Sequence, residues 1–324
     1  MPGAPEPADM TTAFIFPGQG SQSVGMMNAL ADRYPGVRDT FAEAAEAAGL
    51  DLWRLVNEGP EGELDLTVNT QPALLAADVA TWRVWRECGA AAPAVMAGHS
   101  LGEYAALVCA GVLDFAAAVK LVQNRGRYMQ AAVPEGAGAM AAILGLEDQA
   151  VEAACAKAAN GEVVAAANYN TPGQVVIAGH AAAVKRAIAA AQQAGAKRAV
   201  LLPVSVPSHC ELMRPAADLL RRDLDAANLR AGSIPVIQNV DAEPRSDADG
   251  VRKALVEQLC RPVQWVQCTR RIRSMGVDRA IECGPGKVLA GLVRRIEPDI
   301  ETVAGADPGV VAAQLENRGC ELGT

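Results

Sequence analysis

The segment at residues 98–102, Gly-His-Ser-Leu-Gly, matches the pattern G-x-S-x-G and makes Ser100 a candidate nucleophile. This motif works when a strand precedes it and a helix follows, because the sharp turn between them lifts the serine hydroxyl above the sheet edge. An apolar run at residues 94–97 comes before it, and a helical pattern at residues 103–110 comes after it. The flanks therefore favour nucleophilic chemistry on an acyl group over the alternative, an ordinary glycine–serine turn.

A serine nucleophile needs a base, and the chain contains only three histidines, His99, His180 and His209. His99 neighbours Ser100, and a side chain at that point of the motif is expected to point away from the nucleophile. His180 falls between an expected strand and helix, where a solvated histidine is the simplest interpretation. His209 lies where the chain returns from an expected inserted domain, and loops at such junctions line clefts. We predict that His209 is the base; a structural histidine is the alternative.

A third residue to orient the imidazole is not evident. Alpha/beta-hydrolases supply an acid in the chain order Ser, acid, His. The acids between Ser100 and His209 fall on expected helices or in the inserted domain, away from strand ends of the main sheet. They are Glu103, Asp114, Glu135, Glu147, Asp148, Glu152 and Glu162. A dyad whose histidine is held by a carbonyl is therefore favoured over a triad.

A second loop, residues 16–22 (Phe-Pro-Gly-Gln-Gly-Ser-Gln), follows the first expected strand. It is not a dinucleotide fingerprint, because Ser23 stands where the third glycine of G-x-G-x-x-G belongs. Its flexible glycines suit an oxyanion hole in which Gln19 gives one backbone N–H and Leu101 the other. A tight turn without chemistry is the alternative.

Arg125 falls on the apolar side of an expected helix at residues 115–131, for which Asp114 is placed as the cap. The other members of that apolar stripe are Ala118, Leu121, Val122 and Met129. An arginine is unfavourable there unless it meets an anion. We interpret it as a guanidinium that awaits a substrate carboxylate. A salt bridge with an internal acid, or a side chain that extends to solvent, is the alternative.

The composition excludes several classes of protein. The chain has 324 residues, 51% of them hydrophobic, so it can bury a core. With 29 basic and 37 acidic residues the net charge is −8, which argues against nucleic acid as a partner. No apolar run reaches the ~18 residues of a membrane span, and the N-terminus lacks a signal-peptide pattern. Eight scattered cysteines without a C-x-x-C pair indicate reduced thiols, so we expect a cytoplasmic protein.

Strands and helices alternate along most of the chain, which predicts an α/β fold with a parallel sheet covered by helices. Residues 134–205 differ, because their pattern reads βαββαβ, the order of a ferredoxin-like unit. We therefore expect a hydrolase-like core made of residues 10–133 and 206–324, with a ferredoxin-like small domain at 134–205 inserted into it. Residues 1–9 are expected to form a flexible tail.

At these residues the sequence resembles the malonyl-CoA:acyl-carrier-protein transacylases, over nearly the whole chain from about residue 12 to 308. Seven segments carry the resemblance, and their order makes it specific. They are PGQGSQ (17–22), GHSLGEY (98–104), NRGRYMQ (124–130), NTPGQVVIAG (170–179), VPSHC (206–210), QLCRPVQW (258–265) and ECGPGKVL (282–289). The family fold is a hydrolase-like α/β core with a ferredoxin-like insertion, in agreement with the expectation above.

The resemblance implies roles for individual residues. Ser100 is similar to the acylated nucleophile of the family, His209 to its base, and Arg125 to the arginine that binds the malonyl carboxylate. The resemblance further implies that the backbone N–H groups of Gln19 and Leu101 form the oxyanion hole.

The family residue that orients the histidine through its carbonyl is matched by Gln258, which would account for the absent acid. The implied reaction is a ping-pong transfer from malonyl-CoA to the phosphopantetheine thiol of acyl carrier protein, in fatty-acid biosynthesis. It requires no metal and no cofactor, and we expect a monomer. Two other functions stay open: a serine hydrolase with water as acceptor, and a non-catalytic subunit that binds carrier protein.

Overall fold

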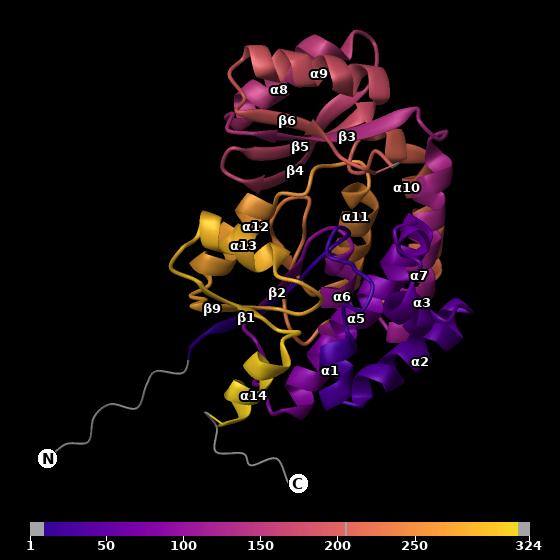
Figure 1. The fold of residues 1–324 in the computed structure, drawn as a ribbon, viewed down its shortest axis with the longest axis vertical. Helices are drawn as coiled ribbons and strands as arrows, with labels where there is room; N and C mark the ends of the chain where they lie inside the picture. Colours follow the sequence, from indigo (N-terminus) through magenta and orange to yellow (C-terminus); the bar gives the residue numbers. More distant parts are fainter. Residues whose placement is uncertain (1–9, 205, 317–324) are drawn as a thin grey trace, which may run out of the picture.

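The computed structural model describes residues 10–204 and 206–316, so the tail predicted at residues 1–9 lies outside the described residues. A six-stranded sheet forms the centre of the larger unit (Figure 1). Its strands in spatial order are β10 (Glu301–Ala304), β9 (Arg279–Glu282), β1 (Thr12–Phe16), β2 (Val95–Gly98), β7 (Val236–Ile237) and β8 (Pro244–Arg245). All neighbours pair in parallel except β7 and β8, which are antiparallel. The predicted parallel-sheet core of an α/β protein is therefore confirmed.

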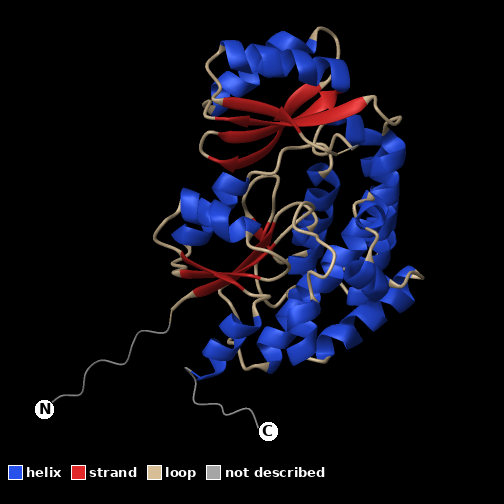
Figure 2. Cartoon of the chain, in the orientation of Figure 1, coloured by secondary structure: helices blue, strands red, loops and turns tan. Residues whose placement is uncertain are grey.

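Alternate side chains of β1 point to opposite faces of this sheet, as the two-residue period of a strand requires. Phe14 and Phe16 enter one buried cluster, whereas Ala13 and Ile15 enter another. Ten helices of the described chain surround the first cluster: α1 (Asn28–Arg33), α2 (Gly36–Ala48), α3 (Leu52–Glu58), α4 (Glu61–Leu64), α5 (Thr67–Glu87), α6 (Gly102–Cys109), α7 (Phe115–Ala132), α10 (Arg214–Ala226), α11 (Ala248–Gln258) and α14 (Pro308–Glu316). A 3₁₀ turn, Glu211–Met213, precedes α10. The second cluster is covered by α12 (Trp265–Ser274) and α13 (Val288–Ile296). Helices thus lie on both faces of the sheet (Figure 2).

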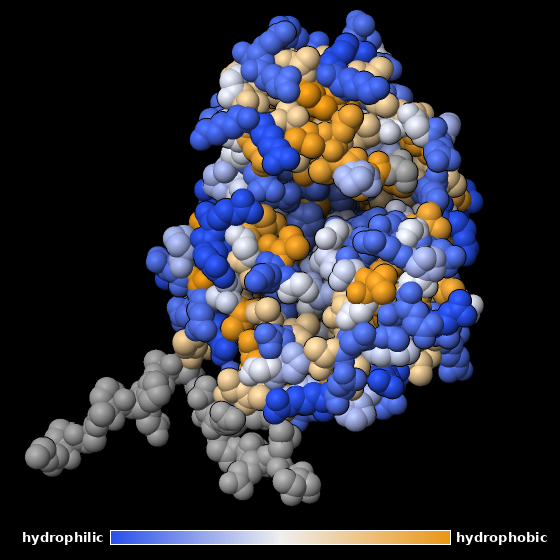
Figure 3. Space-filling view, in the orientation of Figure 1, coloured by the Kyte–Doolittle hydropathy of each residue, from blue (hydrophilic) through white to orange (hydrophobic). Residues whose placement is uncertain are grey.

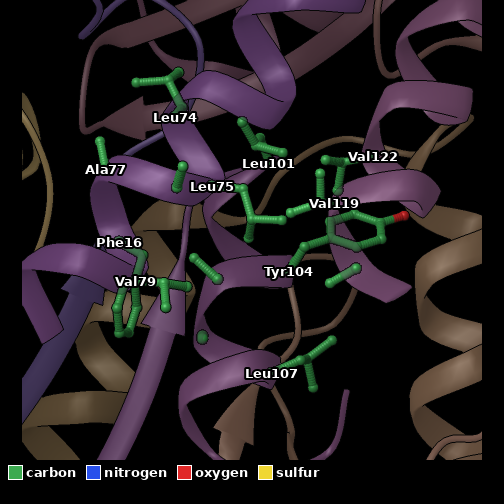
Figure 4. Packing of buried hydrophobic residues seen from close by; sticks show 14 of the residues in the cluster. Phe16, Leu74, Leu75, Ala77, Val79, Leu101, Tyr104, Leu107, Val119 and Val122 are labelled. Carbon is green, nitrogen blue, oxygen red and sulfur yellow. The ribbon is translucent and has the colours of Figure 1, made fainter. Parts of the chain in front are cut away.

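The helix that follows β2 is held in place by apolar packing rather than by a side-chain cap. Leu101 and Tyr104 pack among Leu75 of α5 and Val119 and Val122 of α7, all of them buried (Figure 4). Burying side chains of this size stabilises the fold by roughly 1.5–3 kcal/mol each. The start of α6 is therefore fixed relative to α5 and α7, the helices that carry Gln71 and Arg125.

The smaller unit is a four-stranded antiparallel sheet, drawn above the larger unit in Figure 1. Its elements follow the predicted order: β3 (Gly138–Leu144), α8 (Asp148–Ala159), β4 (Val164–Thr171), β5 (Gln174–His180), α9 (Ala181–Gln193) and β6 (Arg198–Leu201). The strands lie in the spatial order β4-β5-β3-β6, and α8 and α9 bury an apolar cluster against one face. Met140 and Ala178 on the other face pack with Cys210 of the larger unit.

The two units are joined by backbone hydrogen bonds beside β4. The Tyr169 N–H donates to the Val263 carbonyl at 3.0 Å, and the Val263 N–H donates to the Ala167 carbonyl at 2.9 Å. At its end, β4 continues to Thr171 through two irregularities in its pairing with β5. The additional pairing with Val263 explains this extension. None of the described helices is long and apolar enough to cross a membrane.

Candidate active site

Ser100 lies in the sharp turn between β2 and α6, with a backbone φ of 53° in the left-handed region. Neither flanking glycine has room for a side chain. A Cβ on Gly98 would lie 1.9 Å from the Gly102 carbonyl carbon, and a Cβ on Gly102 would lie 2.0 Å from the Phe16 carbonyl oxygen. The turn is therefore compact and strained, as a nucleophile elbow requires.

Ser100 and His209 are 109 residues apart in the chain but meet in the structure. Ser100 Oγ lies 2.8 Å from His209 Nε2, and His209 Nδ1 lies 2.7 Å from the Gln258 carbonyl oxygen. Because a carbonyl only accepts hydrogen bonds, Nδ1 carries the proton, and Nε2 is left to accept from the serine hydroxyl. Burial, together with the nearby charge of Arg125, lowers the pKa of His209 to about 3. The imidazole is thus neutral at physiological pH, the form that can act as a base.

Arg125 reaches this dyad from the buried face of α7 and is only 1% exposed. Its Nη2 donates to Ser100 Oγ at 3.2 Å and to Gln258 Oε1 at 2.9 Å, and its Nη1 donates to Gln71 Oε1 at 2.8 Å. Its guanidinium carbon lies 5.4 Å from the centre of the Tyr104 ring. No carboxylate of the described residues forms an ion pair with it. This buried cation beside the serine therefore forms no ion pair within the described part of the chain.

Behind the dyad, Asn239 and Glu103 fix the turn from below. Asn239 Oδ1 accepts from the Ser100 N–H at 2.7 Å, and its Nδ2 donates to the Gly98 carbonyl at 2.6 Å. Glu103 Oε2 accepts from the Asn239 N–H at 2.8 Å and from Gln258 Nε2 at 3.1 Å. Burial raises the pKa of Glu103 to about 7, although these hydrogen bonds and Arg125 act in the opposite direction. One buried carboxyl thus links the residue that holds Ser100 to the residue that holds His209.

Gln19 and Leu101 line the same cavity as Ser100 and His209, a space of about 380 Å³ between the two units. Its walls include Met140 and residues 202–204 on the side of the smaller unit, and Figure 3 shows the surface hollowed where the units meet. Neither backbone N–H, of Gln19 or of Leu101, donates a hydrogen bond within the described chain. Both groups are therefore available to a bound oxyanion.

With this geometry established, comparison with known proteins places the chain in a family. The model of the acyl transferase domain family matches residues 13–307. The chain belongs to this acyltransferase family.

Curated and solved members of the family are similar to this acyltransferase over almost its whole length. The malonyl CoA-acyl carrier protein transacylase of Escherichia coli (strain K12) is 57% identical over 304 residues, which is 94% of this chain and 98% of that protein. The structure of the malonyl CoA-acyl carrier protein transacylase from Coxiella burnetii is 50% identical, with a TM-score of 0.93 over 95% of this chain and 97% of that one. A malonyl-transacylase in complex with its type II PKS acyl-carrier protein is 52% identical, with a TM-score of 0.93 over 94% of this chain and 99% of that one.

The other two histidines of the acyltransferase are more engaged than the sequence suggested. His99 lines the cavity, and its Nε2 lies 2.9 Å from Asn170 Oδ1 on β4, so its ring connects the two units. The Nδ1 of the half-buried His180 accepts from the Val163 N–H at 2.9 Å, so its ring also has a structural contact. Neither ring contacts Ser100.

Sequence reasoning assigned no role to three residues that support the site: Glu103, Asn239 and Gln71. Glu103 lies within the GHSLGEY segment, and Asn239 follows the apolar strand β7 of the parallel sheet, near the strand ends where site residues gather. Those two positions were detectable signals. Gln71 had none, because its role depends on how α5 packs against α7. Among the described residues no cluster of three or more His, Cys, Asp or Glu is arranged to hold a metal ion.

Proposed function

We propose that this acyltransferase moves a malonyl group from malonyl-CoA to the phosphopantetheine thiol of an acyl carrier protein, for fatty-acid biosynthesis. The observation that carries the proposal is the unpaired guanidinium of Arg125, 3.2 Å from Ser100 Oγ. A carboxylated acyl group on Ser100 would supply the missing anion through a charge-assisted hydrogen bond. The names of the similar proteins, and the solved complex with a carrier protein, support this substrate and this partner.

In the first half of the reaction, neutral His209 takes the proton of Ser100 as its Oγ attacks the malonyl thioester. The backbone N–H groups of Gln19 and Leu101 stabilise the oxyanion, and each such donor is worth roughly 10²–10³ in rate. The carbon–sulfur bond then breaks, and His209 returns its proton to the departing coenzyme A thiolate. The product is a malonyl ester of Ser100.

The second half repeats these steps with a different thiol. Once coenzyme A has left, the phosphopantetheine thiol of carrier protein gives its proton to His209 and attacks the ester carbonyl. The bond to Ser100 Oγ breaks, the serine recovers the proton, and malonyl carrier protein leaves. This ping-pong sequence uses neither a metal ion nor an organic cofactor. Throughout, the carbonyl of Gln258 keeps the proton on Nδ1 of His209.

We further propose that the chain is divided into two domains. We assign residues 134–205 to a ferredoxin-like domain inserted into a hydrolase-like core at 10–133 and 206–324, of which residue 205 and residues 317–324 lie outside the described residues. The βαββαβ order and the spatial order β4-β5-β3-β6 support this assignment. The cavity lies where the two meet, so the insertion forms one wall of the substrate site. All of the proposed site residues come from one chain, so a monomer suffices.

The proposal is tested by the selectivity of Arg125→Ala. The rate of Ser100 acylation is measured with malonyl-CoA and with acetyl-CoA, from the time course of coenzyme A release. Loss of charge-assisted hydrogen bonds of about 1.5–3 kcal/mol predicts a malonyl-to-acetyl ratio about 10- to 100-fold lower. Arg127→Ala is the matched control, because Arg127 lies on the exposed side of the same helix. An equal loss with both substrates would refute the role of Arg125 in binding the carboxylate.

The same assay separates the proposal from a serine hydrolase, which shares the Ser100–His209 pair but uses water as the acceptor. A hydrolase releases free malonate continuously in the absence of carrier protein. The transacylase stops after one equivalent of coenzyme A and resumes when carrier protein is added. If a fluorophosphonate probe does not label Ser100, both enzymatic functions fail, and a non-catalytic subunit that binds carrier protein is the function that remains.

A further inference from the structure

Gln71 is a buried amide behind Arg125 that takes no part in the steps above. It lies near the start of α5 and is fully enclosed. Its Oε1 accepts from Arg125 Nη1 at 2.8 Å, and its Nε2 donates to Met129 Sδ at 3.5 Å. Both of these neighbours line the cavity, but Gln71 is not among the lining residues. Gln71 would therefore affect a substrate in the cavity indirectly, through Arg125 and Met129, and not by direct contact.

The distance between Gln71 and Arg125 is fixed by a close contact of two helix backbones. At Gly126, the residue after Arg125, an added Cβ would lie 2.7 Å from the Thr67 carbonyl oxygen and 2.9 Å from the Val68 Cα. The first turn of α5 and the middle of α7 are therefore in direct contact, as glycine permits. This contact sets the distance between the side chains at positions 71 and 125, so a new side chain at position 71 would face Arg125 at the same spacing.

The acceptor that Gln71 offers to Arg125 is a neutral amide oxygen and not a carboxylate. Arg125 donates to two side-chain oxygens besides that of Ser100, and both belong to neutral amides, Gln71 and Gln258. Its Nε is buried and has no partner among the described residues. A neutral acceptor orients the planar guanidinium without satisfying its charge, whereas a carboxylate at the same distance would form an ion pair strengthened by the low dielectric of the interior.

We infer that Gln71 is a positioning residue that sets the selectivity for carboxylated acyl groups, by holding Arg125 through a neutral oxygen. The inference rests on the proposed function, because it needs Arg125 to receive the substrate carboxylate. Replacing the amide by a carboxylate would place a permanent rival anion on Nη1. The enzyme would then bind malonyl groups less well relative to acetyl groups, with Ser100, His209 and the two oxyanion N–H groups unchanged.

The test compares Gln71→Glu with Gln71→Met, which removes the acceptor without adding a charge. The ratio of malonyl to acetyl acylation rates, obtained from kcat/KM for coenzyme A release, is measured for each. Gln130→Glu is the matched control, since it adds the same charge to an exposed position on α7. We expect the ratio to be about 10- to 100-fold lower for Gln71→Glu, the range for a hydrogen bond to a charged group, and less reduced for Gln71→Met.

The outcomes separate this inference from the proposed function. A folded Gln71→Glu, checked by circular dichroism and thermal melting, that keeps the wild-type ratio would overturn the inference, as would a uniform loss with both substrates. If Gln71→Glu does not fold, an unchanged ratio in Gln71→Met overturns it. Arg125→Ala is measured in the same series. If that variant also keeps the wild-type ratio, the proposed function itself fails, and not merely the role of Gln71.

Discussion

Two clusters of buried polar side chains in the larger unit are organised in opposite ways. The first, the Ser100 network, consists of Ser100, Glu103, Arg125, Asn239, Gln258 and His209. The second, the Asp78 pair, consists of Asp78 on α5 and Glu282 at the end of β9. In the network, each side chain forms hydrogen bonds with other members that come from different helices and loops. In the pair, Glu282 accepts from the N–H groups of Leu289 and Ala290, but neither oxygen of Asp78 has a partner among the described residues.

The difference shows what keeps a charge available in the interior. Burial and the neighbouring Glu282 raise the pKa of Asp78 well above its usual value, so this carboxyl holds its proton. Glu103 is equally buried, but hydrogen bonds from Asn239 and Gln258 limit the rise of its pKa to about 7. Hydrogen bonds thus determine whether an enclosed acid can ionise. The network retains charged groups next to Ser100, whereas the pair contains an acid that burial keeps neutral.

The largest effect is expected from His209→Ala, which removes the proposed base from the network. The rate of Ser100 acylation by malonyl-CoA should fall by about 10²–10⁴-fold, the usual contribution of a positioned base. Coenzyme A release measures it, with His180→Ala as the control, because His180 lies in the smaller unit and its ring accepts from a backbone N–H there. A loss below about threefold would show that the observed Ser100–His209 contact is not the reactive one.

A smaller loss is expected from Asn239→Ala, which leaves the Ser100 N–H and the Gly98 carbonyl without their partner. Each unsatisfied buried group costs about 1–3 kcal/mol, so both the acylation rate and the free energy of unfolding should decrease. Acylation kinetics and urea unfolding check the two effects, with exposed Asn228→Ala as the control. Unfolding that weakens while acylation stays at the wild-type rate would make Asn239 structural only.

The Asp78 pair predicts a stability change of the opposite sign. The folded-state pKa of Asp78 is raised, so the unfolded chain releases a proton that the folded chain keeps, and stability falls as the pH rises above about 4. Asp78→Asn removes this penalty, so the variant should gain stability over the wild type as the pH rises from 5 to 8, by at most about 1.4 kcal/mol per pH unit. Urea unfolding at both pH values measures it. An exposed Asp218→Asn serves as control, and an Asp78→Asn that gains no stability over the wild type between pH 5 and pH 8 would contradict the account.

The smallest effect concerns the pH dependence of acylation. The lowered pKa of His209, about 3, keeps the base neutral from pH 8 down to pH 5. The acylation rate should therefore lack the acid limb near pH 6.5 that an unperturbed histidine produces. Any residual change near pH 7 should come from Glu103 and disappear in Glu103→Gln. A decrease with a midpoint near 6.5 that persists in this variant would show that His209 titrates normally.

Much of the fold was predictable from the sequence because it depends on local patterns. The strand before Ser100, the helix after it and the Asp114 cap of α7 are as expected, since apolar runs and capping residues act over a few residues. The burial of Arg125 was likewise visible on a helical wheel. The extension of β4 to Thr171 was not, because it depends on pairing with Val263 about 90 positions along the chain.

The candidate site divides in the same way. Ser100 and His209 could be named from a motif and from the scarcity of histidines. The partners that hold them, Asn239 and Glu103, lie beside a strand end and within a motif, but their roles depend on contacts between the end of β7, α6 and α11. Gln258 was inferred only from a resemblance, and its side chain has an additional contact with Arg125. Sequence therefore indicates the proposed reacting groups, whereas the packing of helices determines what supports them.

The most direct test of the central claim is the intact mass of the protein after incubation with malonyl-CoA. We predict a gain of one malonyl group that is absent in Ser100→Ala, weaker with acetyl-CoA, and removed when phosphopantetheinylated carrier protein is added. Free malonate without a lasting adduct, or an adduct that survives in Ser100→Ala, would contradict a malonyl ester on Ser100 as the intermediate.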